Sequence, residues 1–117
     1  MAFRFEELKV WQIALRLSNE IDMLVKPFPK EELYSLSSQM KRAADSVVLN
    51  IAEGSTGQSM PEFKRFLGIA LRSAIEVVSC LFISHTRKYI NDADFKKYYE
   101  EYEILCKMIT KLRDSMQ

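Results

Sequence analysis

Apolar side chains recur every three or four residues along four stretches of the chain, which is the spacing of one face of an α-helix. The first stretch runs from Phe5 through Leu8 and Trp11 to Ile21 and Leu24. Residues that break or cap helices separate the four stretches. The pattern therefore predicts four helices, over residues 5–25, 31–54, 60–88 and 92–115.

The connections between these helices carry start and stop signals. Pro27 and Pro29 cannot continue a helix, so they separate the first helix from the second. Gly54 stands where a glycine in the left-handed conformation can cap the end of the second helix. Ser59 and Glu62 have the spacing of a capping box, which predicts that the third helix begins there.

Long helices with short connections pack as antiparallel neighbours. The sequence therefore predicts an all-α fold, an antiparallel up-down-up-down four-helix bundle about 30 to 40 Å long. A chain of 117 residues has enough apolar surface for one core but not for two, so we expect a single domain over residues 1–117. The sequence leaves the order of the helices around the bundle open.

The second and third helices carry more apolar residues than one core can take up. On a helical wheel Leu49 lies about 180° from the core stripe of the second helix. Four apolar residues of the third helix lie about 100° to 140° from Ala70, which is on its core stripe, and thus well outside that stripe. The stripe of the second helix comprises Leu33, Leu36, Met40, Ala43, Ala44, Val47 and Ile51, and the surplus residues of the third are Ile69, Ile75, Phe82 and Ile83.

Two explanations fit this surplus: a central position in the fold, or an interface with other subunits. Each helix of a simple four-helix bundle keeps a solvated side, and large exposed apolar patches are uncommon on monomers. The interface is therefore the favoured explanation, and the sequence predicts a homo-oligomer.

Composition narrows the function classes. Seventeen basic residues against sixteen acidic ones give a net charge of +1, which disfavours a single subunit that binds nucleic acid or membranes by charge alone. Cys80 and Cys106 lack the spacing of a disulfide framework or a zinc site, so we expect buried thiols.

The charged N-terminus does not look like a secretory signal, and Arg72 and Glu76 make the most apolar stretch a poor membrane span. We expect a cytoplasmic protein without a membrane partner.

Residues for catalysis are sparse. His85 has no neighbours in the sequence that would mark a catalytic triad or a metal cluster, and the glycines match no phosphate-binding motif. The sequence therefore predicts no enzyme, no catalytic residue, no metal, no cofactor and no small-molecule substrate.

Polar residues form a ribbon beside the core stripe of the second helix: Gln39, Arg42, Ser46, Asn50 and Glu53. We interpret it as a solvated or partly buried face in which Asn50 and Glu53 make capping and inter-helix hydrogen bonds. On the third helix Arg72 and Glu76 are four residues apart, and we expect them to pair.

Basic residues come in adjacent pairs, and acidic residues offset most of them. A ring of subunits would repeat each pair around an axis and concentrate a positive field that one subunit lacks. The candidate nucleic-acid contacts are Lys41, Arg42, Lys64 and Arg65.

The fourth helix carries an aromatic stretch, which comprises Phe95, Tyr98, Tyr99 and Tyr102. We expect these side chains to lie in the core and at the edge of the helix's apolar face, and the alternative is a platform for stacking nucleic-acid bases.

Several blocks of sequence resemble one known family. The most specific block is Asn50-Ile51-Ala52-Glu53-Gly54; the others are Leu8-Lys9-Val10-Trp11, Gln39-Met40-Lys41-Arg42-Ala43-Ala44, and Glu62-Phe63 followed by Phe66-Leu67, Ile69-Ala70, Ser73 and Glu76. In this order they are similar to the four-helix-bundle family named for 23S rRNA intervening-sequence proteins. The positions that the resemblance marks as structural or interface residues are Gln39, Ser46, Asn50, Glu53, Gly54, Arg72, Ser73 and Glu76.

The resemblance implies a ring-like homopentamer, and a more distant similarity joins the accessory protein of diversity-generating retroelements, which partners a reverse transcriptase and nucleic acid. Two departures matter. The near-neutral charge lacks the basic excess of the accessory proteins, so their nucleic-acid role transfers poorly, and Arg72, where many relatives have glycine, argues against close helix approach at that turn. The leading hypothesis is a non-enzymatic oligomeric scaffold that contacts RNA or a nucleoprotein partner. The alternative is a protein-only interaction module that docks a helical partner on an exposed apolar face.

Overall fold

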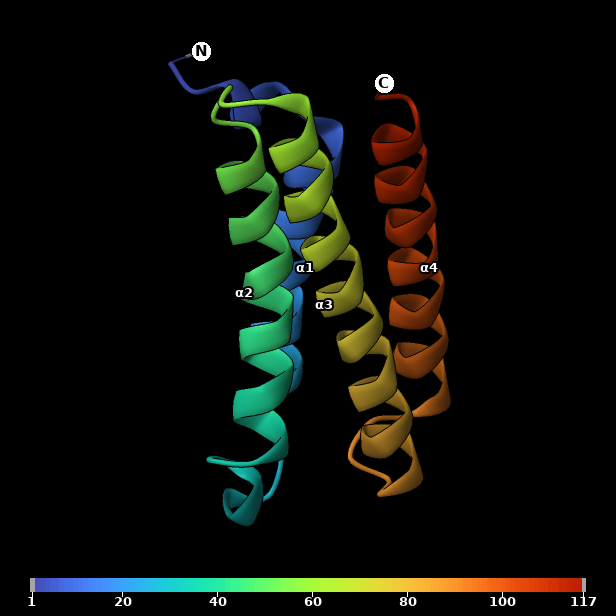
Figure 1. Cartoon of the computed structure of the whole chain (residues 1–117). Helices are drawn as coiled ribbons and strands as arrows, with labels where there is room; N and C mark the ends of the chain where they lie inside the picture. The colour runs from blue at the N-terminus through green and yellow to red at the C-terminus, as the bar shows by residue number, and fades with distance from the viewer. Residues whose placement is uncertain (1, 117) are drawn as a thin grey trace.

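The computed structural model describes residues 2–116 and contains four α-helices (Figure 1). They are α1 (Lys9–Leu24), α2 (Leu36–Gly54), α3 (Met60–Thr86) and α4 (Asp92–Asp114), and two short 3-10 turns, η1 (Arg4–Glu7) and η2 (Lys30–Glu32), precede α1 and α2. The described residues contain no strand. The predicted all-α fold with four helices is confirmed.

The helices lie side by side in the order α1, α2, α3, α4, so that α1 and α3 are diagonally opposite. Contact is most extensive between α2 and α3 and least extensive between α4 and α1. The bundle measures 43 × 22 × 22 Å. Successive helices traverse its long axis in alternating directions, and both termini lie at the same end (Figure 1).

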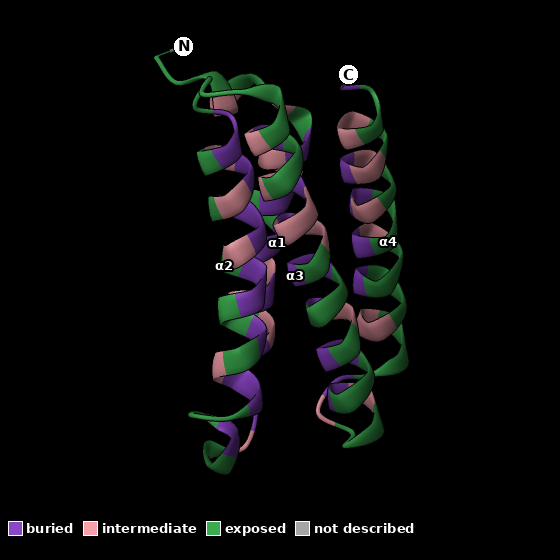
Figure 2. Cartoon of the chain, viewed as in Figure 1, coloured by how far each residue is buried: buried purple, intermediate pink, exposed green. Residues whose placement is uncertain are grey.

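The core lies along the central axis, where each helix turns its buried stripe inward (Figure 2). All four helices contribute large side chains that are fully buried, so the chain has one continuous core. These include Leu17, Ile21, Met40, Val47, Ile51, Leu67, Val77, Leu81, Tyr102, Leu105 and Ile109.

The first helix begins at Lys9 rather than at residue 5. Leu8 has an extended backbone (φ −79°, ψ 122°) and separates α1 from η1. The side chain of Glu6 accepts a hydrogen bond from the backbone N–H of Phe3 at 3.0 Å, which closes η1 into its own turn. Phe5 packs on Trp11 with 4.7 Å between ring centroids, so the apolar spacing continues across a break in the helix.

The second helix begins at Leu36 rather than at residue 31, because a distant contact holds the preceding turn. Glu32 is buried, and its carboxylate accepts hydrogen bonds from the Tyr89 hydroxyl at 2.8 Å and from Arg87 at 2.9 Å. Ser35 has a non-helical backbone. Leu33 therefore lies outside α2 and is 53% exposed, so its predicted place in the core stripe is wrong.

Gly54 is required for a reason other than the predicted cap. It is the last residue of α2, and only Gly57, three residues later, has a positive φ among the described glycines (88°). A Cβ on Gly54 would lie 2.7 Å from Cβ of Phe66 and 3.0 Å from the Phe63 ring. The absent side chain allows α2 and α3 to approach closely at this level.

The ends of α3 agree only in part with the prediction. The Ser59 hydroxyl accepts a hydrogen bond from the backbone N–H of Glu62 at 3.2 Å, as a capping box requires, but the Glu62 carboxylate binds Arg65 instead of returning to Ser59. At the other end α3 stops at Thr86 rather than at residue 88, because Lys88 takes the left-handed conformation (φ 64°). The last helix ends at residue 114, one residue before the predicted bound.

Candidate polar groove between α2 and α3

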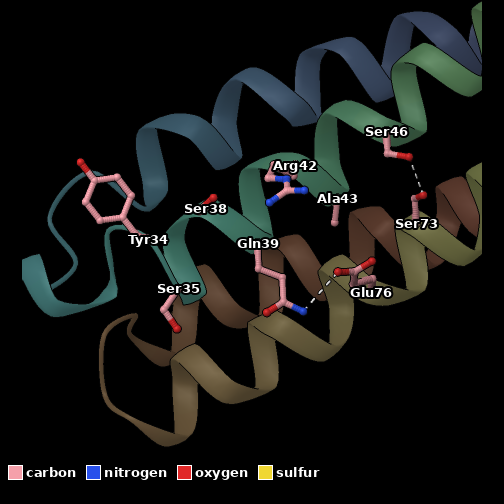
Figure 3. A pocket seen from close by; sticks show the side chains of 9 residues that line it. All are labelled: Tyr34, Ser35, Ser38, Gln39, Arg42, Ala43, Ser46, Ser73 and Glu76. Carbon is pink, nitrogen blue, oxygen red and sulfur yellow. Dashed lines mark hydrogen bonds between the residues drawn. The ribbon is translucent and has the colours of Figure 1, made fainter.

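Polar side chains of α2 reach across to α3 beside the core. The hydroxyls of Ser46 and Ser73 are 2.8 Å apart, and the Gln39 side-chain amide donates to the Glu76 carboxylate at 3.2 Å (Figure 3). Asn50 donates to the backbone carbonyl of Ser46 at 2.8 Å and to its hydroxyl at 3.0 Å. Five of the motif positions therefore form a polar seam made of two hydrogen-bonded groups, Gln39 with Glu76 and Ser46 with Ser73 and Asn50.

The interpretation of the polar ribbon is partly corrected by these contacts. Gln39 and Ser46 make the inter-helix hydrogen bonds, whereas Asn50 bonds within its own helix. Arg72 is exposed and does not pair with Glu76, whose hydrogen-bond partner is Gln39. The expected Arg72–Glu76 pair is wrong because the neighbouring helix supplies a competing donor to the carboxylate.

A groove with a volume of about 510 Å³ opens above this seam toward the N-terminal end of α2 (Figure 3). Its lining is mostly polar and comprises Tyr34, Ser35, Ser38, Gln39, Arg42, Ala43, Ser46, Ser73 and Glu76. One guanidinium, one carboxylate, one amide and several hydroxyls thus share a single surface depression.

Within residues 2–116 Arg42 has no ion-pair partner, although it is the one cation that lines the groove. Its neighbour Lys41 instead faces α1, where its ammonium lies 3.4 Å from the Asp22 carboxylate. Tyr34 is 93% exposed. The groove therefore offers an uncommitted positive charge and an uncommitted aromatic ring.

The predicted nucleic-acid contacts do not gather on one surface of the subunit. Because Gly54 packs against Phe63 and Phe66, Lys64 lies level with the C-terminal end of α2, about 18 Å along the axis from Arg42. Arg65 is paired with Glu62 at 2.9 Å. The two basic pairs are thus separated along the bundle, and within the first pair only Arg42 lies on the α2–α3 side, since Lys41 faces α1.

Three groove residues were not among the predicted site residues: Tyr34, Ser35 and Ser38. Ser35 and Ser38 continue the polar ribbon toward the N-terminus with the same spacing of three and four residues that joins Gln39 to Arg42 and Ser46. That spacing is the signal that could have found the two serines. Tyr34 precedes α2, so helical periodicity does not mark it.

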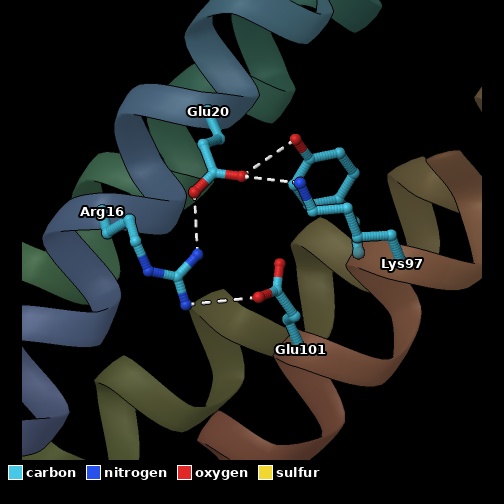
Figure 4. Close-up of polar contacts among 5 residues, drawn as sticks. Arg16, Glu20, Lys97 and Glu101 are labelled. Atoms are coloured by element: carbon cyan, nitrogen blue, oxygen red, sulfur yellow. Dashed lines mark hydrogen bonds and ion pairs between the residues drawn. The ribbon is translucent and has the colours of Figure 1, made fainter.

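A second polar cluster joins α1 to α4 (Figure 4). Arg16 contacts Glu20 at 2.7 Å and Glu101 at 3.2 Å, and Glu20 also accepts from Tyr98 at 3.1 Å and from Lys97 at 3.3 Å. Burial raises the pKa of Glu20, but the hydrogen bonds from Arg16, Tyr98 and Lys97 outweigh it and hold this pKa below its ordinary value. The cluster is ionised and internally balanced.

His85 and the two cysteines have structural surroundings. The His85 ring lies 2.6 Å from the Asp92 carboxylate and stacks on Phe95 at 4.6 Å. Burial raises the pKa of Cys80 to about 11 and also raises that of Cys106, so neither thiol is activated as a nucleophile. No group of three or more potential metal ligands occurs in the part of the chain that the structure describes.

The four helices and their order around one core define the class of the molecule, an all-α four-helix bundle. The family model of the 23S rRNA-intervening sequence protein matches residues 6–111, and the chain belongs to this family.

One solved structure has a TM-score of 0.83 and 24% sequence identity, and the match covers 90% of this chain and 95% of the other. It is a protein of unknown function from the S23 ribosomal protein family of Bacteroides thetaiotaomicron. At this identity the likeness shows the fold alone. No curated protein matches the sequence.

Proposed function

We propose that the chain is a non-enzymatic cytoplasmic scaffold, an antiparallel four-helix bundle that assembles with copies of itself into a ring-like homo-oligomer, with a pentamer favoured. One observation carries this proposal: α3 is much more apolar than its burial in one subunit explains. Its most apolar 18-residue segment has a mean hydropathy of 1.9, yet only 39% of that segment is buried. By length and composition such a helix could cross a membrane, but core helices of soluble bundles share this property.

The apolar surplus of α3 lies beside α4. Ile75 and Phe82 are 55% and 51% exposed. Phe82 meets two aromatic rings of α4, with centroid distances of 5.0 Å to Phe95 and 6.0 Å to Tyr99. We call Ile75, Phe82, Phe95 and Tyr99 the aromatic patch. Self-association would remove this patch from water, which supports an interface at the α3–α4 face.

Light scattering behind size exclusion tests the assembly. The wild-type chain is expected to elute as a species of about five chain masses of 13.7 kDa each. The change Phe82→Glu places a charge in the aromatic patch and should shift the protein toward monomer. Met23→Glu is the matched control, because Met23 is also an exposed apolar residue but lies on α1, diagonally opposite α3. A wild-type monomer at micromolar concentration would remove the scaffold proposal.

A second candidate function is contact with RNA, and the free guanidinium of Arg42 favours it. A ring would repeat Arg42 and the exposed Lys64 in every subunit, so that weak single contacts add up. Affinity for structured RNA measured between about 50 and 200 mM salt should fall by orders of magnitude if several phosphates are bound. Binding that does not depend on salt would contradict this function. A partner that survives nuclease treatment in a pull-down would favour the protein-only module.

A further inference from the structure

We infer that the groove between α2 and α3 binds one unpaired nucleotide of a single-stranded RNA, with the phosphate at Arg42 and the base beside Tyr34. This inference rests on the proposed RNA contact and gives it a place and a geometry. The groove volume of about 510 Å³ lies within the range of about 300–1,000 Å³ that is usual for small-ligand sites.

Arg42 supplies the anion contact. Its guanidinium lines the groove and forms no ion pair within residues 2–116. A guanidinium is well suited to a phosphate because its donors form a planar fork. The adjacent Lys41 has the same charge but faces Asp22 on the α1 side. Of these two neighbouring cations, only Arg42 can therefore contact a ligand in the groove.

Tyr34 supplies the stacking surface. It borders the groove just before the N-terminal end of α2 and is 93% exposed. Its ring projects outward from this turn, so a base stacked on it would lie at the outer rim of the groove (Figure 3). No ring lies within stacking distance of it in the described part of the chain. Exposed aromatic rings of this kind are the usual platform for unstacked bases of single-stranded RNA.

The opposite wall of the groove orients the nucleotide. The Glu76 carboxylate accepts one hydrogen bond from Gln39 and has acceptor capacity left. A carboxylate repels a phosphate but accepts hydrogen bonds from base amino and imino groups, so the phosphate belongs at Arg42 and the base edge at Glu76. Guanine presents an imino and an amino donor side by side, and it is therefore the base that this wall fits best.

Affinity for a fluorescently labelled twelve-nucleotide single-stranded RNA that contains guanine tests the inference, with a duplex of the same sequence for comparison. We expect Arg42→Gln to weaken binding by about tenfold and to flatten the salt slope by about 0.7, the contribution of one phosphate on a single strand. Lys41→Gln is the matched control. It removes the same charge one residue away and should have less than a threefold effect.

Tyr34→Ala should weaken binding by about tenfold, as expected for the loss of one stacked base, whereas Tyr34→Phe should bind like the wild type. Both Arg42 and Tyr34 are exposed, so these variants should keep the helical circular dichroism of the parent.

The outcomes separate the groove from the broader function. Equal losses for Arg42→Gln and Lys41→Gln would show binding by charge alone, which overturns the groove and leaves RNA contact standing. Equal affinity for duplex and single strand would also overturn the groove. If the wild-type chain binds neither RNA at 50 mM salt, the groove and the RNA contact both fall, while the oligomeric scaffold is judged separately by light scattering.

Discussion

Two helix interfaces of this bundle use polar groups in opposite ways. Between α2 and α3 most of the groups are neutral: Ser46 and Ser73 are in contact at 2.8 Å in a partly buried site, and the one carboxylate, Glu76, accepts from Gln39 at the exposed edge. Between α1 and α4 the groups are full charges at the surface, with Arg16 and Glu20 at the centre of the cluster. The first interface is the most extensive contact in the bundle and the second is the least extensive.

The difference indicates which of the two helix contacts is the more rigid. Close packing at Gly54 and partly buried hydrogen bonds give the α2–α3 contact a fixed geometry, on which the groove depends. Exposed ion pairs contribute about 0 to 1 kcal/mol each and weaken in salt, so the α1–α4 contact is the softer one. Only two buried side-chain polar atoms lack a hydrogen-bond partner within residues 2–116, Oε2 of Glu101 and the hydroxyl of Tyr102, and both belong to α4.

The largest expected effect comes from filling the close approach of α2 and α3. Gly54→Val would bring a Cβ to 2.7 Å from Cβ of Phe66, so the helices must separate. We expect a loss of about 3 kcal/mol in the free energy of unfolding, measured by urea denaturation.

Gly68→Ala is the matched control for this change. Gly68 lies inside α3, and an added Cβ would meet nothing within 4 Å. Alanine should stabilise the helix by up to about 1 kcal/mol. If both glycine variants had the same effect, helix propensity rather than close approach would explain Gly54, and the contrast between the interfaces would lose its main support.

The second prediction compares a hydrogen bond of the α2–α3 interface with an ion pair of the α1–α4 interface. Ser73→Ala should cost about 1 kcal/mol, because the Ser46 hydroxyl loses a partner in a partly buried site. A double-mutant cycle with Ser46→Ala should give a coupling energy of similar size. The same cycle for Arg16→Ala and Glu101→Ala should give less than about 0.5 kcal/mol. A larger coupling between Arg16 and Glu101 would reverse the ranking of the two interfaces.

The third prediction concerns pH and the α1–α4 cluster. The pKa of Glu20 is held below its ordinary value of 4.5, so the folded state favours the ionised carboxylate. The stabilisation from Glu20 is therefore complete above about pH 5 and is lost as the pH falls below 4.5 through the lowered pKa.

Glu20→Gln tests this pH dependence. The variant should be less stable than the wild type at pH 7 by about 0.5 kcal/mol, and the difference should vanish at about pH 3 and in 1 M salt. Urea denaturation at each pH measures both curves. A difference that persists in acid would mean that Glu20 acts by packing rather than by charge.

The fold could be predicted from the sequence wherever the controlling residues are local. The two prolines at 27 and 29 and the N-cap Ser59 mark helix ends by their own chemistry, and the structure places helix ends beside each of them. The start of α2 could not be predicted, because Glu32 is held by Tyr89, which lies 57 residues away in the sequence.

For the candidate site too, the sequence predicted the residues marked by local spacing but not their contacts with other helices. Periodicity marked the polar ribbon of α2, so Gln39, Arg42 and Ser46 were found. Which partner each would take depended on the order of the helices around the bundle. The pairing of Gln39 with Glu76, in place of Arg72, is a tertiary fact with no local signal.

The smallest expected effect is at Tyr102, a side chain of α4 that is fully buried and whose hydroxyl has no hydrogen-bond partner. Burial raises the pKa of Tyr102 well above its ordinary value, as expected for a hydroxyl in an apolar setting. Removing an unpaired buried hydroxyl costs no hydrogen bond, so Tyr102→Phe should leave the free energy of unfolding unchanged or raise it by up to about 1 kcal/mol.

Tyr98→Phe is the comparison for this change, since the Tyr98 hydroxyl donates to Glu20 at 3.1 Å and its removal should cost about 0.5 to 1 kcal/mol. If the Tyr102 hydroxyl has no hydrogen-bond partner, urea denaturation should show a lower free energy of unfolding for Tyr98→Phe and an unchanged or higher one for Tyr102→Phe. A loss of 1 kcal/mol or more for Tyr102→Phe would show that its hydroxyl is hydrogen-bonded in solution. Oε2 of Glu101 would then be the one buried side-chain polar atom without a partner in the described part of the chain, and the contrast in hydrogen bonding between the two interfaces would be smaller.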